Sequence, residues 1–166
     1  GTTFRVPEGI VRLDTDSTHG WQLRYGNGKT EMFSDHSGDG SGAGRALKLA
    51  KAALHKRIQK LPAPTGLMTQ PRAFKSSDLP VGISGPAERI RSGRNTATYS
   101  FQVSVPRPDA GSTTRTVYIG TANTFTPERE AQALEKAIAM RDAAVRAYKA
   151  AATKAKRVDS AKLLPR

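Results

Sequence analysis

The sequence predicts an α+β protein made of two tandem small domains, each a three-stranded antiparallel sheet packed on one C-terminal helix. Strand-like alternation followed by an amphipathic helical segment occurs twice along the 166 residues. Both cycles open on a Pro-x-Gly-Ile motif, at residues 7–10 and at residues 80–83. Between them, residues 62–78 contain Pro, Gly and Ser and predict a linker, because proline interrupts regular structure.

The first domain is expected to span residues 1–61. Its three predicted strands are residues 9–13, 21–25 and 29–33. The pair Asn27-Gly28 is a strong hairpin signal, because both residues tolerate a positive φ. Apolar side chains at steps of three and four predict a helix over residues 45–61. Alternation places Trp21 on the inward face, so we expect it to be buried against this helix, with stacking on nucleic acid as the alternative.

The second domain is expected to span residues 79–152. Its predicted strands are residues 88–91, 97–105 and 114–120. The inward side chains of the middle strand are expected to be Tyr99, Phe101, Val103 and Val105. Thr126 as cap, Pro127 at the first helical position and Glu128 in the first turn predict the start of a helix that runs to about Ala152.

Both predicted helices carry the pattern Ala-Leu-x-x-Ala, at residues 46–50 and at residues 133–137. Small side chains let a helix lie close to a sheet, which suits a three-stranded sheet covered by one helix. Residues 153–166 are rich in lysine and arginine and are expected to form a basic C-terminal tail.

The charge of the chain predicts a polyanionic partner. Lysine and arginine number 27 against 14 aspartates and glutamates, a formal net charge of +13. Such a field attracts phosphate over long distances, which favours nucleic acid and argues against an acidic or neutral metabolic enzyme. The charge is +4 in residues 1–70 and +9 in residues 71–166, so we expect the second half to dominate non-specific binding.

Several classes of protein are disfavoured. The absence of cysteine excludes disulfides, thiolate zinc sites and cysteine nucleophiles. The uncharged stretches are too short to span a membrane and residues 1–5 do not begin a signal peptide, so we expect a soluble, cytoplasmic protein without a membrane partner. The initial glycine predicts a processed or excised piece of a longer protein.

No catalytic or metal-binding arrangement is predicted. The glycine-rich residues 38–44 lack the Lys-Ser/Thr ending of a phosphate-binding P-loop and are expected to be a connector. The three histidines do not have the spacing of metal ligands. Asp35-His36-Ser37 contains the residue types of a hydrolytic triad, but three consecutive residues cannot form its relay of hydrogen bonds. We therefore expect no enzyme activity, no metal and no cofactor.

Polar side chains are expected on the sheet faces opposite the helices. In the first domain these are Arg12, Gln22 and Arg24. In the second domain they include Arg89, Arg91, Gln102 and Ser104. Arginine and glutamine make paired hydrogen bonds with guanine and adenine edges, so these residues are candidate base readers. A face that is merely solvated is the alternative.

The motifs Gly9-Ile10-Val11-Arg12 and Gly20-Trp21-Gln22-Leu23-Arg24, followed by an Ala-rich helix, resemble the Apetala-two/ethylene-response-factor type of DNA-binding domain and its bacterial and integrase-arm relatives. In the second domain residues 99–103 take the place of the second strand, and residues 125–131 resemble that family's approach to its helix. The resemblance covers about residues 6–61 and 79–152. It implies that each sheet enters the major groove, with the candidate base readers above facing the bases.

Other polar residues are candidates for phosphate contact. They are Lys29, Arg107, Arg115, Thr116, Lys154, Lys156 and Arg157. The sequence thus predicts a non-enzymatic protein that binds double-stranded DNA as a transcription regulator or chromosome-associated factor. The alternatives are an RNA-binding or ribosome-associated protein and the DNA-binding accessory portion of a recombinase or phage protein. The oligomeric state is left open.

Overall fold

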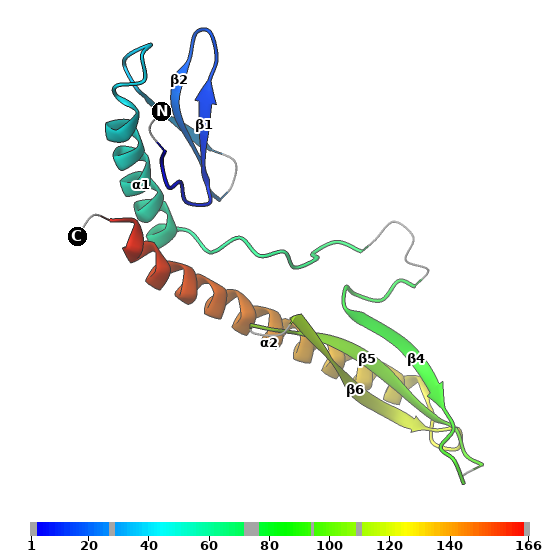
Figure 1. The fold of residues 1–166 in the computed structure, drawn as a ribbon. Coiled ribbons are helices and arrows are strands. Elements are labelled where there is room, and N and C mark those ends of the chain that lie inside the picture. Colours follow the sequence, from blue (N-terminus) through cyan, green and yellow to red (C-terminus); the bar gives the residue numbers. More distant parts are fainter. Residues whose placement is uncertain (1–2, 27–28, 72–76, 94, 109–110, 165–166) are drawn as a thin grey trace. The chain divides into compact units, whose positions relative to one another are not determined.

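The structure, a computed structural model, describes residues 3–26, 29–71, 77–93, 95–108 and 111–164 (Figure 1). Its elements are β1 (Ile10–Asp14), β2 (His19–Arg24), β3 (Thr30–Ser34), α1 (Ala43–Lys60), β4 (Ile83–Arg89), β5 (Thr98–Arg107), β6 (Gly111–Thr121), α2 (Pro127–Ser160) and the 3₁₀-helix η1 (Ala161–Leu163). The strands form two three-stranded antiparallel sheets, ordered β1-β2-β3 and β4-β5-β6. The predicted α+β class, with two such sheets and two helices, is confirmed. The hairpin predicted at Asn27-Gly28 lies outside the described residues.

The chain divides into two compact units. We call them unit 1, made of Gly1–Thr65 and Ala152–Arg166, and unit 2, made of Gly66–Ala151. The C-terminal segment therefore belongs to unit 1 and packs with α1, although it follows the second sheet in sequence.

The repeated Pro-x-Gly-Ile motif forms the same hydrogen-bonded turn in both units. The Ile10 amide donates to the Pro7 carbonyl at 3.2 Å, and the amide of Ile83 donates to the carbonyl of Pro80 at the same distance. The glycine between them has a positive φ in each case, 93° for Gly9 and 80° in the second turn, which glycine adopts at little cost. Each glycine carbonyl also accepts a bond of 2.7 Å from the middle strand of its sheet. The sequence repeat is thus also a structural repeat.

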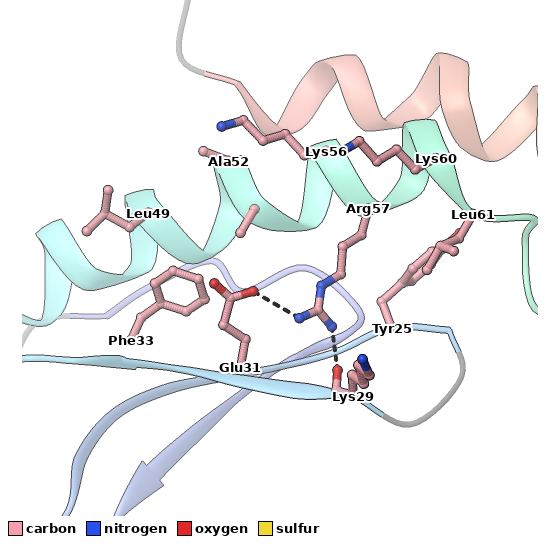
Figure 2. A pocket seen from close by; sticks show the side chains of 11 residues that line it. Tyr25, Lys29, Glu31, Phe33, Leu49, Ala52, Lys56, Arg57, Lys60 and Leu61 are labelled. Carbon is pink, nitrogen blue, oxygen red and sulfur yellow. Dashed lines mark hydrogen bonds and ion pairs between the residues drawn. The ribbon is translucent and has the colours of Figure 1, made fainter.

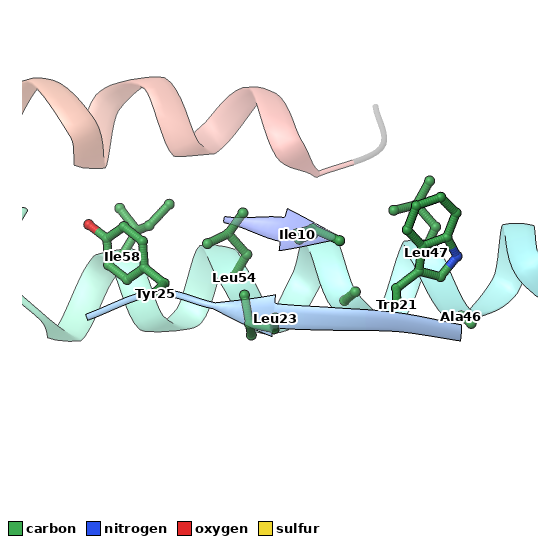
Figure 3. Packing of buried hydrophobic residues seen from close by; sticks show 9 residues of the cluster. Ile10, Trp21, Leu23, Tyr25, Ala46, Leu47, Leu54 and Ile58 are labelled. Atoms are coloured by element: carbon green, nitrogen blue, oxygen red, sulfur yellow. The ribbon is translucent and has the colours of Figure 1, made fainter. Parts of the chain in front are cut away.

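The core of unit 1 lies between β1, β2 and α1. Trp21 and Leu23 on β2 face Leu47, Leu54 and Ile58 on α1 (Figure 3). Trp21 is only 3% exposed, and its indole N–H donates to the Ala43 carbonyl at 2.8 Å. The burial predicted for Trp21 is confirmed.

The core of unit 2 has the same layout with different side chains. Phe101 and Val103 on β5 and Val117 on β6 pack against α2. Val103 pairs with Ile83 as Leu23 pairs with Ile10, so Phe101 in unit 2 occupies the position equivalent to that of Trp21 in unit 1. Phe101 therefore takes the place of the tryptophan, whereas an alignment of residues 99–103 with the motif that begins Gly20-Trp21 would put Tyr99 there.

The two Ala-Leu-x-x-Ala patterns occupy equivalent places in the two cores. Ala46 and Ala50 of α1 are buried, and so are Ala133 and Ala137 of α2. Since a methyl group lets the helix approach the sheet closely, this explains why the motif occurs in both helices.

Helix α2 begins as predicted and ends later than predicted. The Thr126 hydroxyl accepts the amide of Arg129 at 3.3 Å, the geometry of an N-cap. Rather than ending at Ala152 and leaving a free tail, the helix continues to Ser160, which is buried in unit 1. There the Gln59 side chain donates to the Ser160 hydroxyl at 3.0 Å. The expected basic tail is therefore mostly helical and packed.

Candidate nucleic-acid interface

Strand register shows which side chains point away from the helices. In unit 1 the pair Ile10–Leu23 lies on the core side, so the alternate pairs Val11–Gln22 and Gln22–Met32 lie on the opposite, outer face. Arg24 is on the same outer face, and its Nε donates to the Gln22 Oε1 at 2.5 Å. Gln22 and Arg24 thus stand side by side as predicted, next to exposed apolar side chains.

The placement predicted for Arg12 is wrong. Arg12 pairs with Trp21 and lies on the helix-facing side, with its guanidinium 5.1 Å from the centre of the indole ring. Its Nη2 forms an ion pair with the buried Asp35 carboxylate at 2.6 Å, and this hydrogen bond raises the pKa of Arg12 above its usual value. The side chain of Arg12 is 28% exposed and that of Asp35 is 0% exposed. Arg12 therefore neutralises a buried charge in the fold.

The outer face of unit 2 is mostly polar. Register puts there Ser84, Ala87, Arg89, Thr98, Ser100, Gln102, Ser104, Thr114, Thr116 and Tyr118. Thr116 donates to the Gln102 Oε1 at 3.2 Å, while the Gln102 amide donates to the Ser100 hydroxyl at 3.4 Å. These bonds orient the Gln102 amide at the centre of the sheet. The base-reading candidates Gln102 and Ser104 therefore share one face with Arg89.

The candidate Arg91 lies just beyond β4 and is exposed. It lines a polar cleft of about 590 Å³ together with Asn95, Thr96, Thr98, Tyr118, Thr121 and Asn123. Tyr118 is 58% exposed. Tyr118 was not among the predicted site residues, although it lies between the apolar residues Val117 and Ile119, which are buried, so alternation would place it outward. Arg91 and Tyr118 together give unit 2 a cation and an aromatic ring at one end of the outer face.

No described strand residue places a carboxylate on either outer face. The acidic residues within the described strands are Asp14, Glu31 and Glu88, and register places each on the helix-facing side. Glu31 is paired there with Arg57 at 2.9 Å. His19 donates a hydrogen bond to Asp14 and lowers the pKa of that carboxyl. A polyanion approaching either outer face would thus meet hydrogen-bonding groups without a negative charge from the strands.

The phosphate candidates are spread over several surfaces. Arg107 is exposed at the end of β5. Arg115 is exposed but pairs with Val103, so it lies on the helix-facing side of β6. Lys29 is exposed beside α1 rather than on the outer face. Thr116 is on the outer face, as described above.

The three C-terminal phosphate candidates lie in the last turns of α2, in unit 1. The Lys156 ammonium donates to the Glu8 carboxylate at 2.8 Å and lowers the pKa of Glu8. Arg157 has an exposed side chain, and its backbone carbonyl accepts a bond from Gln59. Lys154 is exposed. Of these three candidates, Lys154 and Arg157 form no ion pair with a described residue, whereas Lys156 does.

The larger share of the positive charge lies on unit 1 and not, as expected, on the second half of the chain, because the C-terminal segment belongs to unit 1. Unit 1 contains 15 basic and 7 acidic residues, a net charge of +8, and unit 2 contains 12 and 7, a net charge of +5. Much of the charge of unit 1 lies on α1, which has six lysines and arginines and no acidic residue. These α1 cations were not among the predicted site residues, although the helix sequence shows them.

Among the described residues, no group of three histidine, aspartate or glutamate side chains is arranged to hold a metal ion. No described helix combines the length and apolar character needed to cross a membrane. Comparison of the chain with protein-family models, with curated proteins and with solved structures gives no match.

Proposed function

We propose that the chain is a tandem pair of βββα domains that binds double-stranded DNA without enzymatic activity, as a transcription regulator or chromosome-associated factor. In this proposal the outer face of each sheet enters the major groove, and its helix packs behind the sheet. The observation that carries the proposal is that no described strand residue places a carboxylate on either outer face, in a chain of net charge +13. The resemblance of both units to Apetala-two/ethylene-response-factor domains supports the same binding mode.

The chemistry of the outer faces suits base edges. The major groove admits β-structure as well as a helix, and arginine and glutamine pair with guanine and adenine. In unit 1 the readers would be Gln22 and Arg24, with Arg24 released from its bond to Gln22 on binding. In unit 2 the readers would be Arg89, Arg91, Gln102 and Ser104. Arg12 is excluded as a reader by its ion pair with Asp35.

Two linked binding units would strengthen one another. When one domain is bound, the chain raises the effective concentration of the other near neighbouring DNA. Lys154, Arg157 and Arg107 would add contacts to phosphate, which strengthen binding without reading sequence.

Fluorescence anisotropy with a labelled mixed-sequence duplex tests the proposal, with matched variants that each remove one cation. Arg24→Ala and Arg89→Ala remove cations from the outer faces. The controls Lys48→Ala on α1 and Lys136→Ala on α2 remove exposed cations from the helices of the same units. We expect each outer-face variant to weaken binding by about tenfold, the loss of one good base contact.

The helix controls are expected to stay within about twofold of the parent chain, because screening limits the effect of a charge that touches no phosphate. Equal losses in outer-face and helix variants would contradict the sheet-face assignment. Unchanged affinity in Arg24→Ala and Arg91→Ala would contradict it as well. Circular dichroism of each variant establishes that the fold is retained.

Binding of single-stranded RNA is the second candidate function, and one observation favours it. Tyr118 exposes its ring on the outer face of unit 2, beside the polar cleft with Arg91. Proteins that read single-stranded RNA stack bases on such rings. Competition between duplex DNA and single-stranded RNA separates the candidates, and Tyr118→Ala is expected to weaken RNA binding if the ring stacks on bases. Preferential capture by RNA that depends on Tyr118 would replace the duplex proposal.

A further inference from the structure

Unit 1 contains a groove on the other side of its sheet from the proposed DNA face. It is about 670 Å³ in volume and runs between the edge strand β3 and helix α1. The groove is open at the surface and is drawn in Figure 2 with the side chains that line it.

The floor of the groove is apolar. Phe33 on β3 and Leu49 on α1 lie at one end, and Tyr25 and Leu61 lie at the other (Figure 2). Leu49 is 56% exposed, a large apolar surface for a side chain on a helix that otherwise buries its leucines. Apolar surface of this kind, rimmed by polar groups, is typical of a binding groove.

An ion pair divides the groove into two halves. Arg57 of α1 reaches across to β3, where its guanidinium donates to the Glu31 carboxylate at 2.9 Å and to the Lys29 carbonyl at 2.5 Å (Figure 2). The Phe33–Leu49 half and the Tyr25–Leu61 half therefore lie on either side of a neutral bridge. This arrangement suits a ligand with two apolar side chains separated by polar residues.

The rim is positive. Lys29, Lys56 and Lys60 are exposed around the groove, and none of them forms an ion pair within the part of the chain that the structure describes. Glu31 is the acidic residue of the lining, and Arg57 already neutralises it. A ligand in this groove thus meets three unpaired ammonium groups above an apolar floor.

We propose that this groove binds an acidic peptide segment of a partner protein, with two bulky apolar side chains in the two halves and its carboxylates beside the three lysines. Charge complementarity and the apolar floor together select this partner. Nucleic acid would satisfy the lysines, but it has no aliphatic side chains to fill the two apolar halves. The proposal goes beyond DNA binding and does not rest on it, since it uses residues outside the proposed DNA face.

Anisotropy of labelled synthetic peptides with the full chain tests the proposal. The probe is an acidic amphipathic peptide of Glu, Asp, Leu and Phe, and the comparison peptide has serine at each Leu and Phe. We expect Leu49→Ser and Lys56→Glu each to weaken binding of the probe by about tenfold or more, and the serine peptide to bind about as weakly. The matched control Lys48→Glu makes the same charge reversal on α1 at a residue that does not line the groove, and is expected to stay within about threefold of the parent.

Methyl NMR gives a second readout that does not depend on affinity. Saturating peptide is expected to shift the methyl signals of Ala52, Ala53 and Leu61, which line the groove. Equal losses in Lys48→Glu and Lys56→Glu, equal binding of the serine peptide, or methyl shifts outside the groove would each overturn the proposal. Displacement of the bound peptide by duplex DNA, with Lys56→Glu weakening both ligands equally, would assign the groove lysines to nucleic acid instead. Arg24→Ala, which tests the DNA face, is expected to leave peptide binding unchanged.

Discussion

Replacing Arg12 by alanine is expected to destabilise unit 1 rather than to impair base recognition. The Asp35 carboxylate is fully buried and has its ion pair with Arg12 at 2.6 Å, so the substitution leaves a buried charge without that partner. Removing one member of a buried pair costs about 3–5 kcal/mol, because the remaining charge loses its compensation. Since Arg12 is itself 28% exposed, water reaches the site and we expect the low end of that range, about 3 kcal/mol.

Urea unfolding followed by tryptophan fluorescence measures this loss in unit 1. Trp21 is the single tryptophan of the chain and lies in the core of unit 1, so its signal reports the unit that contains the ion pair. At constant slope, a loss of about 3 kcal/mol lowers the urea midpoint by about 1–3 M. The control Arg24→Ala removes an arginine from the outer face of the same sheet and is expected to change stability by less than about 0.5 kcal/mol.

A double variant separates the charge from the packing. Arg12→Met with Asp35→Asn removes both charges and keeps much of the volume, so it is expected to recover at least half of the loss. A loss below about 1 kcal/mol in Arg12→Ala, or no recovery in the double variant, would refute the reasoning that Arg12 compensates a buried carboxylate. Duplex binding by the folded fraction of Arg12→Ala is expected to match the parent.

Three further predictions concern local structure. Gly42→Ala is expected to destabilise unit 1 by at least about 2 kcal/mol in the same urea assay, because the added Cβ would lie 1.8 Å from a backbone oxygen. The control Gly38→Ala has open space around it and is expected to leave stability unchanged. Equal effects of the two substitutions would contradict the steric argument. Thr126→Ala is expected to cost about 1 kcal/mol in thermal unfolding followed by circular dichroism, through loss of the α2 cap; an unchanged midpoint would refute this role. In an NMR titration the pKa of Glu8 is expected to lie below its ordinary value of 4.5 and to rise in Lys156→Met. Because folding lowers this pKa, the ion pair stabilises the fold at pH values above the pKa of the unfolded state. That stabilisation is lost as the pH falls through the pKa of the folded state.

Most elements and the repeat were predictable because they depend on local patterns, but β4 was expected at residues 88–91 and lies at Ile83–Arg89. Alternation identified β2 and β5, and steps of three and four identified α1. The Thr-Pro-Glu start of α2 is a local signal too, since the cap uses residues within one turn. Each of these features follows from residues close together in sequence.

The side of the sheet on which Arg12 lies was not predictable from local patterns. Residues 10–13 read Ile-Val-Arg-Leu, so three of the four are apolar and alternation does not decide which pair faces the core. The deciding contact is the buried carboxylate of Asp35, which lies 23 positions further along the chain. The sequence shows Asp35 only as a polar loop residue, and its burial depends on the close approach of that loop to Gly42.

The prediction of where α2 ends was wrong for a similar reason. Residues 150–157 are rich in alanine and lysine, which favour a helix, and contain neither glycine nor proline to stop it. A charged segment of this kind is also typical of a frayed tail, so composition alone does not decide. The contacts of Ser160 with Gln59 on α1 decide it, and they depend on the tertiary fold.

In unit 1 the α1 cations and the outer face of the sheet lie on opposite sides, so the DNA proposal limits how many cations contact phosphate. The salt dependence of binding measures that number. Six of the cations of unit 1 lie on α1, whereas the outer face of its sheet carries Arg24. For DNA bound on the outer face, the α1 cations would act only through a long-range field, which speeds association. Because they would not contact phosphate, they would not displace counterions from the DNA. The logarithm of the binding constant falls by about 0.9 per phosphate contact for each unit in the logarithm of salt concentration. The slope should therefore follow the few cations beside the sheets and fall well short of the net charge of +13. A slope near the full charge would mean that the helix faces contact phosphate as well, and that the lysines beside the α1 groove serve nucleic acid rather than an acidic peptide.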